Sequence, residues 1–62
     1  MQQYKNLSGK SNVHAFELLE NGIIVQFNDR SQYTYQSMKV GTANLTQMQR
    51  LAVCGQGLNS FI

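Results

Sequence analysis

Cys54 and His14 are the two side chains whose types could support covalent chemistry, as a nucleophile and its general base. The apolar spacing described below places Cys54 at the carboxyl end of a helix, where the helix dipole disfavours the reactive thiolate. The carboxylates of Glu17 and Glu20 fall on different faces of a predicted hairpin, so they form no acid–base pair. We therefore predict a protein that is not an enzyme.

Metal ligands and phosphate-binding loops are also sparse. The chain has one cysteine, one histidine and three carboxylates, without Cys-x-x-Cys or His-x-x-x-His spacing. Gly55-x-Gly57 could present backbone N–H groups to a phosphate, but it lacks the lysine and the spacing of a P-loop. Such glycines are more typical of a helix end followed by a tight turn. We expect no metal, no cofactor and no small-molecule substrate.

Tyr33 and Tyr35 indicate a different chemistry, the stacking of nucleic-acid bases on aromatic rings. They stand two apart in "SQYTYQ", so on a strand they point to the same face. The net charge of +2 and the pI near 9.0 give weak support for a nucleic-acid partner. The candidate nucleic-acid-binding residues are Arg30, Tyr33, Tyr35, Lys39, Arg50 and Lys10.

The length of 62 residues allows one domain with a small core. A single cysteine excludes an internal disulfide, so we expect a homo-oligomer or a protein partner to add stability. The lone thiol and the absence of an apolar signal region predict a location in the reducing cytoplasm. No apolar run approaches the ~20 residues of a membrane span, so we expect no membrane partner.

Asn21-Gly22 is the strongest turn signal, because both residues tolerate the positive φ of a type I′ hairpin turn. That turn pairs Leu18 with Val25 and Phe16 with Phe27. One face of the hairpin, the predicted core face, carries Phe16, Leu18, Ile23, Val25 and Phe27. The other face carries Ala15, Glu17, Leu19, Ile24 and Gln26.

A third strand is predicted at about residues 32–38, and its register decides which face the tyrosines take. A three-residue loop at residues 28–30 pairs Val25 with Tyr33 and turns both rings to the core face. It places Arg30 in the left-handed region, which costs of order 1 kcal/mol for a non-glycine residue. A two-residue loop would turn both rings outward and requires positive φ at two non-glycine residues. We favour rings that point inward, or that lie at the rim with their hydroxyls in water.

A helix is predicted at about residues 44–54, because its apolar residues recur at helical spacing along one stripe. The stripe consists of Leu45, Met48, Leu51 and Ala52. Asn44 with Gln47 resembles a capping box, and Thr42 is the alternative N-cap. Gly55 suits the end of the helix, and Leu58, Phe61 and Ile62 fit one further helical turn laid on the core.

The predicted fold class is α+β: a three-stranded antiparallel β-meander packed on one helix, with a short C-terminal helical turn. Residues 1–10 are polar and are expected to form a flexible N-terminal arm, from which Tyr4 and Leu7 could dock onto the body. Residues 11–62 are expected to form the single domain.

Residues 8–62 resemble the KTSC domain. The resemblance is carried by "SNVHAF", "IIVQFNDRSQYTYQS" and "LAVCGQGLNSFI", in this order and spacing. The matching positions are Ser11, Val13, Phe16, Val25, Phe27, Tyr33, Tyr35, Gly55, Gly57, Asn59 and Phe61. Arg30 replaces the turn glycine of the family. Proteins similar to this one continue past the position of Ile62.

The resemblance implies a function, since the domain is named for the C-terminus of some lysyl-tRNA synthetases. It also occurs as small stand-alone bacterial and phage proteins, and RNA binding is inferred for it from the synthetase setting. The predicted function is thus that of a non-catalytic accessory module that binds RNA. The alternative is a module for protein–protein interaction or self-association, which the paired apolar residues Leu19 and Ile24 favour.

Overall fold

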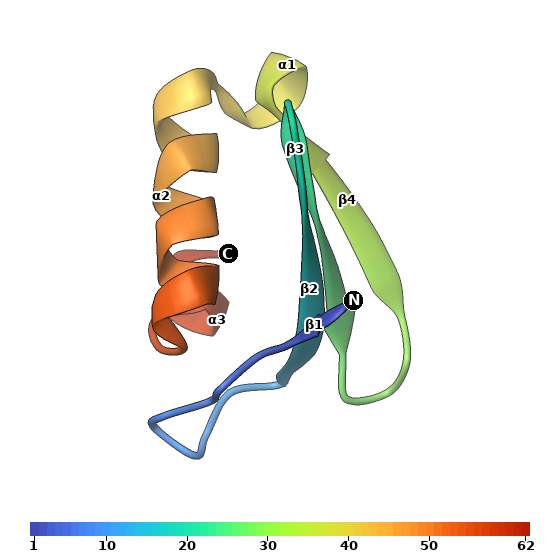
Figure 1. The fold of residues 1–62 in the computed structure, drawn as a ribbon, viewed down its shortest axis with the longest axis vertical. Helices are drawn as coiled ribbons and strands as arrows, with labels where there is room; N and C mark the ends of the chain where they lie inside the picture. The colour runs from blue at the N-terminus through green and yellow to red at the C-terminus, as the bar shows by residue number, and fades with distance from the viewer.

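Four antiparallel strands and three helices make up the fold in a computed structural model that describes residues 1–62. The elements are β1 (Gln2–Gln3), β2 (Val13–Leu19), β3 (Gly22–Phe27), β4 (Gln32–Gln36), α1 (Ser37–Val40), α2 (Thr42–Cys54) and α3 (Leu58–Phe61). The strands form one sheet in the order β1-β2-β3-β4 (Figure 1). The α+β class is confirmed.

The expected number of three strands is wrong by one, because β1 adds to the edge of β2. Gln2 pairs with Phe16 and Gln3 with Ala15. Two glutamines carry no alternation of apolar and polar residues, so they give no strand signal. Tyr4, which follows β1, is only 3% exposed and belongs to the core. Leu7, by contrast, is exposed.

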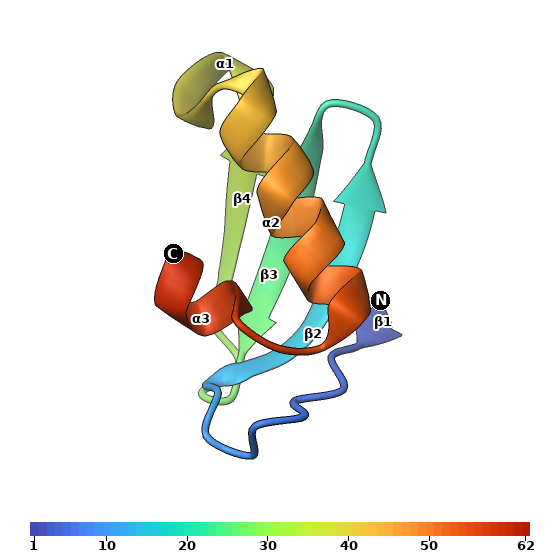
Figure 2. The ribbon, with the colours of Figure 1, turned by 90° about the vertical axis from the view of Figure 1, so that its left-hand side faces the viewer.

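One face of the sheet is covered by helices and the other is open. Figure 1 shows α2 and α3 on the same side of the sheet, and Figure 2 shows α2 crossing in front of the strands. The core lies between these layers, where each apolar side chain gains free energy by leaving water. It consists of Tyr4, Val13, Phe16, Ile23, Val25, Leu45, Met48, Ala52 and Leu58.

The β2–β3 hairpin turns one residue earlier than predicted. Leu19 pairs with Gly22 and Leu18 with Ile23, so the turn residues are Glu20 and Asn21. A type I′ turn at Asn21-Gly22 is wrong, since neither residue has a positive φ. The pairing has moved by two positions in total, so each residue keeps its predicted face of the hairpin. Leu18, predicted on the core face, is nevertheless 45% exposed.

Gly22 is needed for close packing rather than for the turn. A Cβ at this position would lie 2.8 Å from the backbone oxygen of Tyr35 on β4, closer than such atoms approach in folded proteins. The turn itself is held in part by the first residue of α1, since the N–H of Ser37 donates to the carbonyl of Asn21 at 3.0 Å. The turn position is therefore set across the sheet, beyond the range of a local signal.

The β3–β4 connection follows the predicted three-residue loop. Val25 pairs with Tyr33, and the N–H of Phe27 donates to the carbonyl of Ser31 at 2.9 Å. Arg30 has φ 73°, which is the left-handed conformation expected for it. The strand ends at Gln36 instead of residue 38, because α1 begins at Ser37.

The helix predicted at residues 44–54 begins two residues earlier, at Thr42, and ends at Cys54 as expected. Gly41 occupies the N-cap position without a side-chain hydrogen bond, so neither Asn44 nor Thr42 caps the helix. The side chain of Asn44 instead donates to the carbonyl of Val40 at 2.7 Å. None of the helices combines the length and the apolar character that crossing a membrane requires.

The predicted C-terminal turn is present as α3. Leu58 is fully buried, and its N–H donates to the hydroxyl of Tyr4 at 3.4 Å. Gly55 takes the left-handed conformation at the end of α2, with φ 90°. The two ends of the chain therefore meet in the core through Tyr4 and Leu58.

Candidate functional site

Tyr33 and Tyr35 point to the same face of the sheet as the core, but they lie at different depths. Tyr35 pairs with Ile23 and packs against the core cluster. Burial raises the pKa of Tyr35, and the neighbouring Tyr33 raises it further. Tyr33 is 55% exposed. The two rings therefore have separate roles: Tyr35 contributes to packing, and Tyr33 presents an aromatic surface to solvent.

The exposed ring of Tyr33 belongs to a corner of the molecule where β3 turns into β4. It meets the ring of Phe27 edge to face, with centroids 5.6 Å apart and an angle of 72° between the planes. A shallow hollow beside it is lined by Asn12, Phe27, Asn28, Asp29, Ser31 and Tyr33. We refer to these residues, together with Arg30, as the Tyr33 corner.

Arg30 supplies the positive charge of this corner. It shares a second shallow hollow with Phe27 and Asn28, and this hollow also reaches His14. Lys10 belongs to the loop before β2, and that loop is tied to the corner. The N–H of Asn28 donates to the carbonyl of Asn12 at 2.8 Å, and its side-chain amide donates to the carbonyl of Ser11.

Asp29 places a negative charge in the same corner. Its carboxylate accepts hydrogen bonds from the hydroxyl of Ser31 at 2.6 Å and from the N–H of Ser31 at 3.0 Å. These two bonds, the hydroxyl first, lower the pKa of Asp29. The carboxylate therefore remains ionised near neutral pH and offsets part of the charge of Arg30.

Lys39 and Arg50 lie elsewhere. Lys39 is on α1, which follows the far end of β4 (Figure 1). Arg30 precedes the near end, so the backbones of the two residues are separated by the ~17 Å length of a five-residue strand. Arg50 is exposed on α2. The six predicted residues thus form no single cluster. Arg30 and Tyr33 belong to the same corner but line two separate hollows, and the Lys10 loop lies beside that corner.

Phe27 and Asn28 are members of the corner that the sequence analysis did not select. Phe27 was assigned to the core, and it is only partly buried against it. The available signal was the three-residue loop, which puts residues 27 and 31 directly opposite each other and brings Phe27 close to Tyr33. Asn28 had been interpreted only as a turn residue.

An apolar hollow lies near the other end of β4, between the strand, the α1–α2 segment and the C-terminus. Its lining residues are Tyr35, Val40, Asn44, Met48, Phe61 and Ile62. Phe61 and Ile62 are 41% and 46% exposed. Of the apolar residues near the C-terminus, only Leu58 is buried, so this hollow remains open to solvent.

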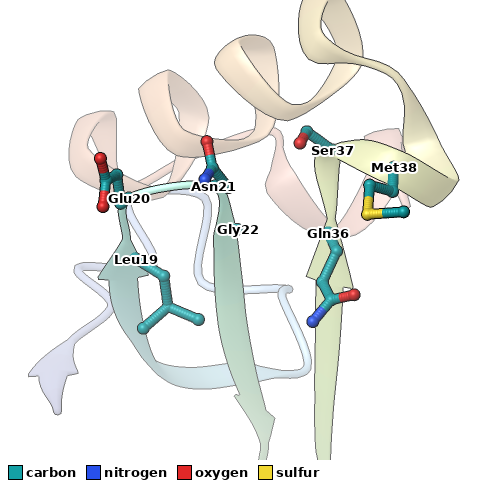
Figure 3. A pocket seen from close by; sticks show the side chains of 7 residues that line it. All are labelled: Leu19, Glu20, Asn21, Gly22, Gln36, Ser37 and Met38. Atoms are coloured by element: carbon teal, nitrogen blue, oxygen red, sulfur yellow. The ribbon is translucent and has the colours of Figure 1, made fainter.

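A fourth hollow lies at the β2–β3 turn, around Gly22. Figure 3 shows the side chains of Leu19 and Gln36 on the two sides of Gly22. Glu20, Asn21, Ser37 and Met38 complete the lining. Met38 is almost fully exposed. The only ionisable group here is the carboxylate of Glu20, so the hollow offers no catalytic pair.

Cys54 and His14 lie on different layers, since Cys54 ends α2 and His14 is on β2. No hydrogen bond joins them, and Cys54 is an exposed free thiol. His14 lines the hollow beside Arg30. No three His, Cys, Asp or Glu side chains come together in a group that could hold a metal ion.

No family model, curated protein or solved structure matches the chain.

Proposed function

We propose that this protein is a small non-catalytic module that binds single-stranded RNA at the Tyr33 corner. The observation that carries the proposal is the half-exposed ring of Tyr33, supported edge-on by Phe27. Arg30 lies in the same corner and lines a second hollow, which shares Phe27 and Asn28 with the hollow beside Tyr33. A base can stack on such a ring, while an arginine and a nearby lysine bind the adjacent phosphates.

The charges of the corner predict weak and salt-sensitive binding. Arg30 is the one cation of the loop, Lys10 lies on the neighbouring segment, and Asp29 opposes both. Stacking contributes about 1–3 kcal/mol per base, and each phosphate contact adds a salt-dependent term. One exposed ring offers a stacking surface for one base, as expected for an accessory contact rather than a whole binding domain.

The resemblance of residues 8–62 to the KTSC domain supports an RNA ligand. That resemblance makes tRNA the first ligand to test, since the domain occurs in some lysyl-tRNA synthetases. It also makes the cytoplasm the expected location. An exposed ring and a nearby cation can bind a nucleotide without any further group. We therefore propose binding and not catalysis.

The test is a titration of the isotope-labelled protein with tRNA and with a short single-stranded oligonucleotide, followed by heteronuclear NMR at low and then moderate salt. We expect shifts in the amides of residues 27–33 that collapse as salt rises. Tyr33→Leu should lose roughly 5–150-fold in affinity, the equivalent of one stacked base. Its melting temperature shows whether it folds.

Two charge variants serve as a matched pair. Arg30→Gln and Lys39→Gln each remove one positive charge, at opposite ends of β4. We expect Arg30→Gln to reduce the slope of log K against log salt by about 0.7, and Lys39→Gln to leave it unchanged. Equal effects would indicate general attraction of a basic protein, and unchanged amides at low salt would contradict RNA binding altogether.

A further inference from the structure

The outer edge of β4 carries backbone groups that no other strand satisfies. β4 is last in the sheet order, so only β3 pairs with it. Hydrogen bonds join Phe27 to Ser31 and Asn21 to Ser37 at the two ends of this ladder. In an antiparallel pair, bonded and non-bonded positions alternate. The N–H and C=O groups of Gln32 and Thr34 and the N–H of Gln36 therefore point away from β3, to the free edge. The C=O of Gln36 belongs to the N-cap of α1.

This edge has none of the usual protection against pairing. Edge strands in natural proteins are blunted by lysine, proline, bulges or a covering segment. The residues of β4 are neutral and include no proline, and the ladder to β3 is regular, without a shift in register. The opposite edge of the sheet differs in two ways. β1 covers part of β2, and β2 carries the charged residue Glu17.

The stretch that contains β4 reads the same in both directions. Residues 31–37 are "SQYTYQS", with Thr34 at the centre. When two antiparallel strands pair about a two-fold axis through Thr34, each residue faces another of its own kind. Tyrosine and threonine are also among the residues that favour strands. An interface between two copies has to be self-complementary in this way.

We propose that a second copy of this chain pairs with β4 along its free edge, antiparallel and with the two-fold axis at Thr34. The pairing joins the two sheets into one through about four backbone hydrogen bonds. It satisfies the outward N–H and C=O of Thr34, the C=O of Gln32 and the N–H of Gln36. No cation or carboxylate lies within the strand, so no like charges face each other.

The pairing also gives the exposed ring of Tyr33 a neighbour. Tyr33 of one copy lies directly opposite Tyr35 of the second copy, on the face that carries the core. Beyond the strand ends, the two-fold axis brings the loop with Asp29 and Arg30 toward the α1 end of the other copy, which carries Lys39. The inference rests on the backbone of β4, and it requires no RNA ligand.

The experiment is sedimentation velocity of the purified chain without nucleic acid, from about 1 µM to 1 mM. The monomer has a mass of 7.0 kDa, and we expect conversion to twice that mass as the concentration rises. Thr34→Lys places two lysines across the axis and should raise the dissociation constant at least tenfold. Thr46→Lys makes the same change at an exposed site of α2 and should leave it unchanged.

Amide hydrogen exchange gives the position of the contact. In the monomer, the N–H groups of Tyr33 and Tyr35 are bonded to β3 and exchange slowly, whereas those of Gln32, Thr34 and Gln36 exchange fast. At high concentration the amides of Thr34 and Gln36 should become protected. Thr34→Pro removes only an outward N–H and should abolish that protection. The amide spectrum of the dilute variant reports whether its fold is retained.

Two results would overturn the proposal. One is a monomer at every concentration. The other is a dimer that is insensitive to Thr34→Lys and leaves the edge amides unprotected, which would place the interface elsewhere, for example at the hollow beside Phe61 and Ile62. Because no nucleic acid is present, neither result bears on RNA binding at the Tyr33 corner.

Discussion

The two turns that flank β3 are stabilised by partners at very different distances along the chain. The β2–β3 turn depends on α2: the side-chain amide of Gln49 donates to the carbonyl of Leu19 at 3.1 Å and to that of Gly22 at 3.0 Å. Gln49 lies in the helical layer, and Leu19 and Gly22 lie in the sheet. The turn therefore has these two hydrogen bonds only when α2 is packed on the sheet.

The β3–β4 loop is held mainly by its own residues. The N–H of Arg30 donates to the carbonyl of Phe27 at 2.9 Å, and the carboxylate of Asp29 accepts both hydrogen bonds from Ser31. Only the bonds of Asn28 to the loop before β2 come from farther away. A loop of this kind keeps most of its bonds when the helices move.

The comparison shows that a strong local signal does not make a turn locally determined. Asn21-Gly22 has the ideal composition for a hairpin turn, yet the chain turns at Glu20 and Asn21. The β3–β4 loop lacks glycine, yet it adopts the expected conformation. A substitution in α2 should therefore disturb the β2–β3 turn, whereas the β3–β4 loop should respond mainly to substitutions among its own residues. Four variants test this contrast, from the largest expected effect to the smallest.

The largest effect is expected from Gly22→Val. The new Cβ would approach the backbone oxygen of Tyr35, so β3 and β4 would have to separate. Overpacking of this kind costs about 1–3 kcal/mol, a large part of the ~3–5 kcal/mol that a core of this size supplies. The measurement is the free energy of unfolding in urea. Ala43→Val, at an exposed site of α2, is the control. A stability equal to that of the control would contradict the close approach.

Gln49→Leu should cost somewhat less and should act at a distance. It leaves the carbonyls of Leu19 and Gly22 without their donor, and a buried polar group that loses its partner costs about 1–3 kcal/mol. Hydrogen exchange should rise at the β2–β3 turn and remain unchanged at the β3–β4 loop. The control is Gln56→Leu, which removes an exposed amide that makes no hydrogen bond. If both loops respond equally, the contrast between the two turns is wrong.

Much of the scaffold could be predicted from patterns that repeat within a few residues. The stripe of Leu45, Met48 and Ala52 predicted α2 and its buried face. The alternation of Tyr33 and Tyr35 with polar residues predicted one shared face. Features without such a period were missed. β1 is an example, since two polar residues become a strand only because β2 offers them an edge.

The candidate site was less predictable, because it depends on what covers each residue. Tyr33 and Tyr35 have equivalent positions in the pattern, but only Tyr35 packs against the core. Lys39 was expected just after a strand that ran to residue 38. The chain leaves the sheet at Ser37 instead, and this places Lys39 on a short helix away from the Tyr33 corner. No local pattern contains that information.

Arg30→Gly should have a smaller effect of the opposite sign. Arg30 has φ 73°, a conformation that costs a non-glycine residue about 1 kcal/mol and costs glycine almost nothing. We expect the variant to be more stable by about that amount in urea unfolding, and to bind RNA more weakly because it loses the cation of the corner. Lys10→Gly removes the same charge at a residue without positive φ. A stability gain in both variants would point to net charge instead of backbone strain.

The smallest effect concerns the pH dependence of the β3–β4 loop. The hydrogen bonds from the hydroxyl and then the N–H of Ser31 lower the pKa of Asp29 below its ordinary value of 3.8. A depressed folded pKa stabilises the fold above the unfolded pKa, and that contribution disappears as the pH falls through the folded value. The side chain is fully exposed, so the effect on stability is slight and is best followed at the group itself.

An NMR titration of the Asp29 carboxyl carbon in the wild type and in Ser31→Ala measures this directly. Ser31→Ala removes the hydroxyl bond and keeps the N–H bond, so the pKa should rise only part of the way toward 3.8. Because the loop retains its backbone bonds, the amide shifts of Leu19 and Gly22 at the other turn should stay the same throughout. An unchanged pKa would mean that the hydroxyl of Ser31 does not hold the carboxylate. A coupled change at the distant turn would show that the two turns of β3 are not independent, and that the local bonds of the second turn also rely on the packed helix.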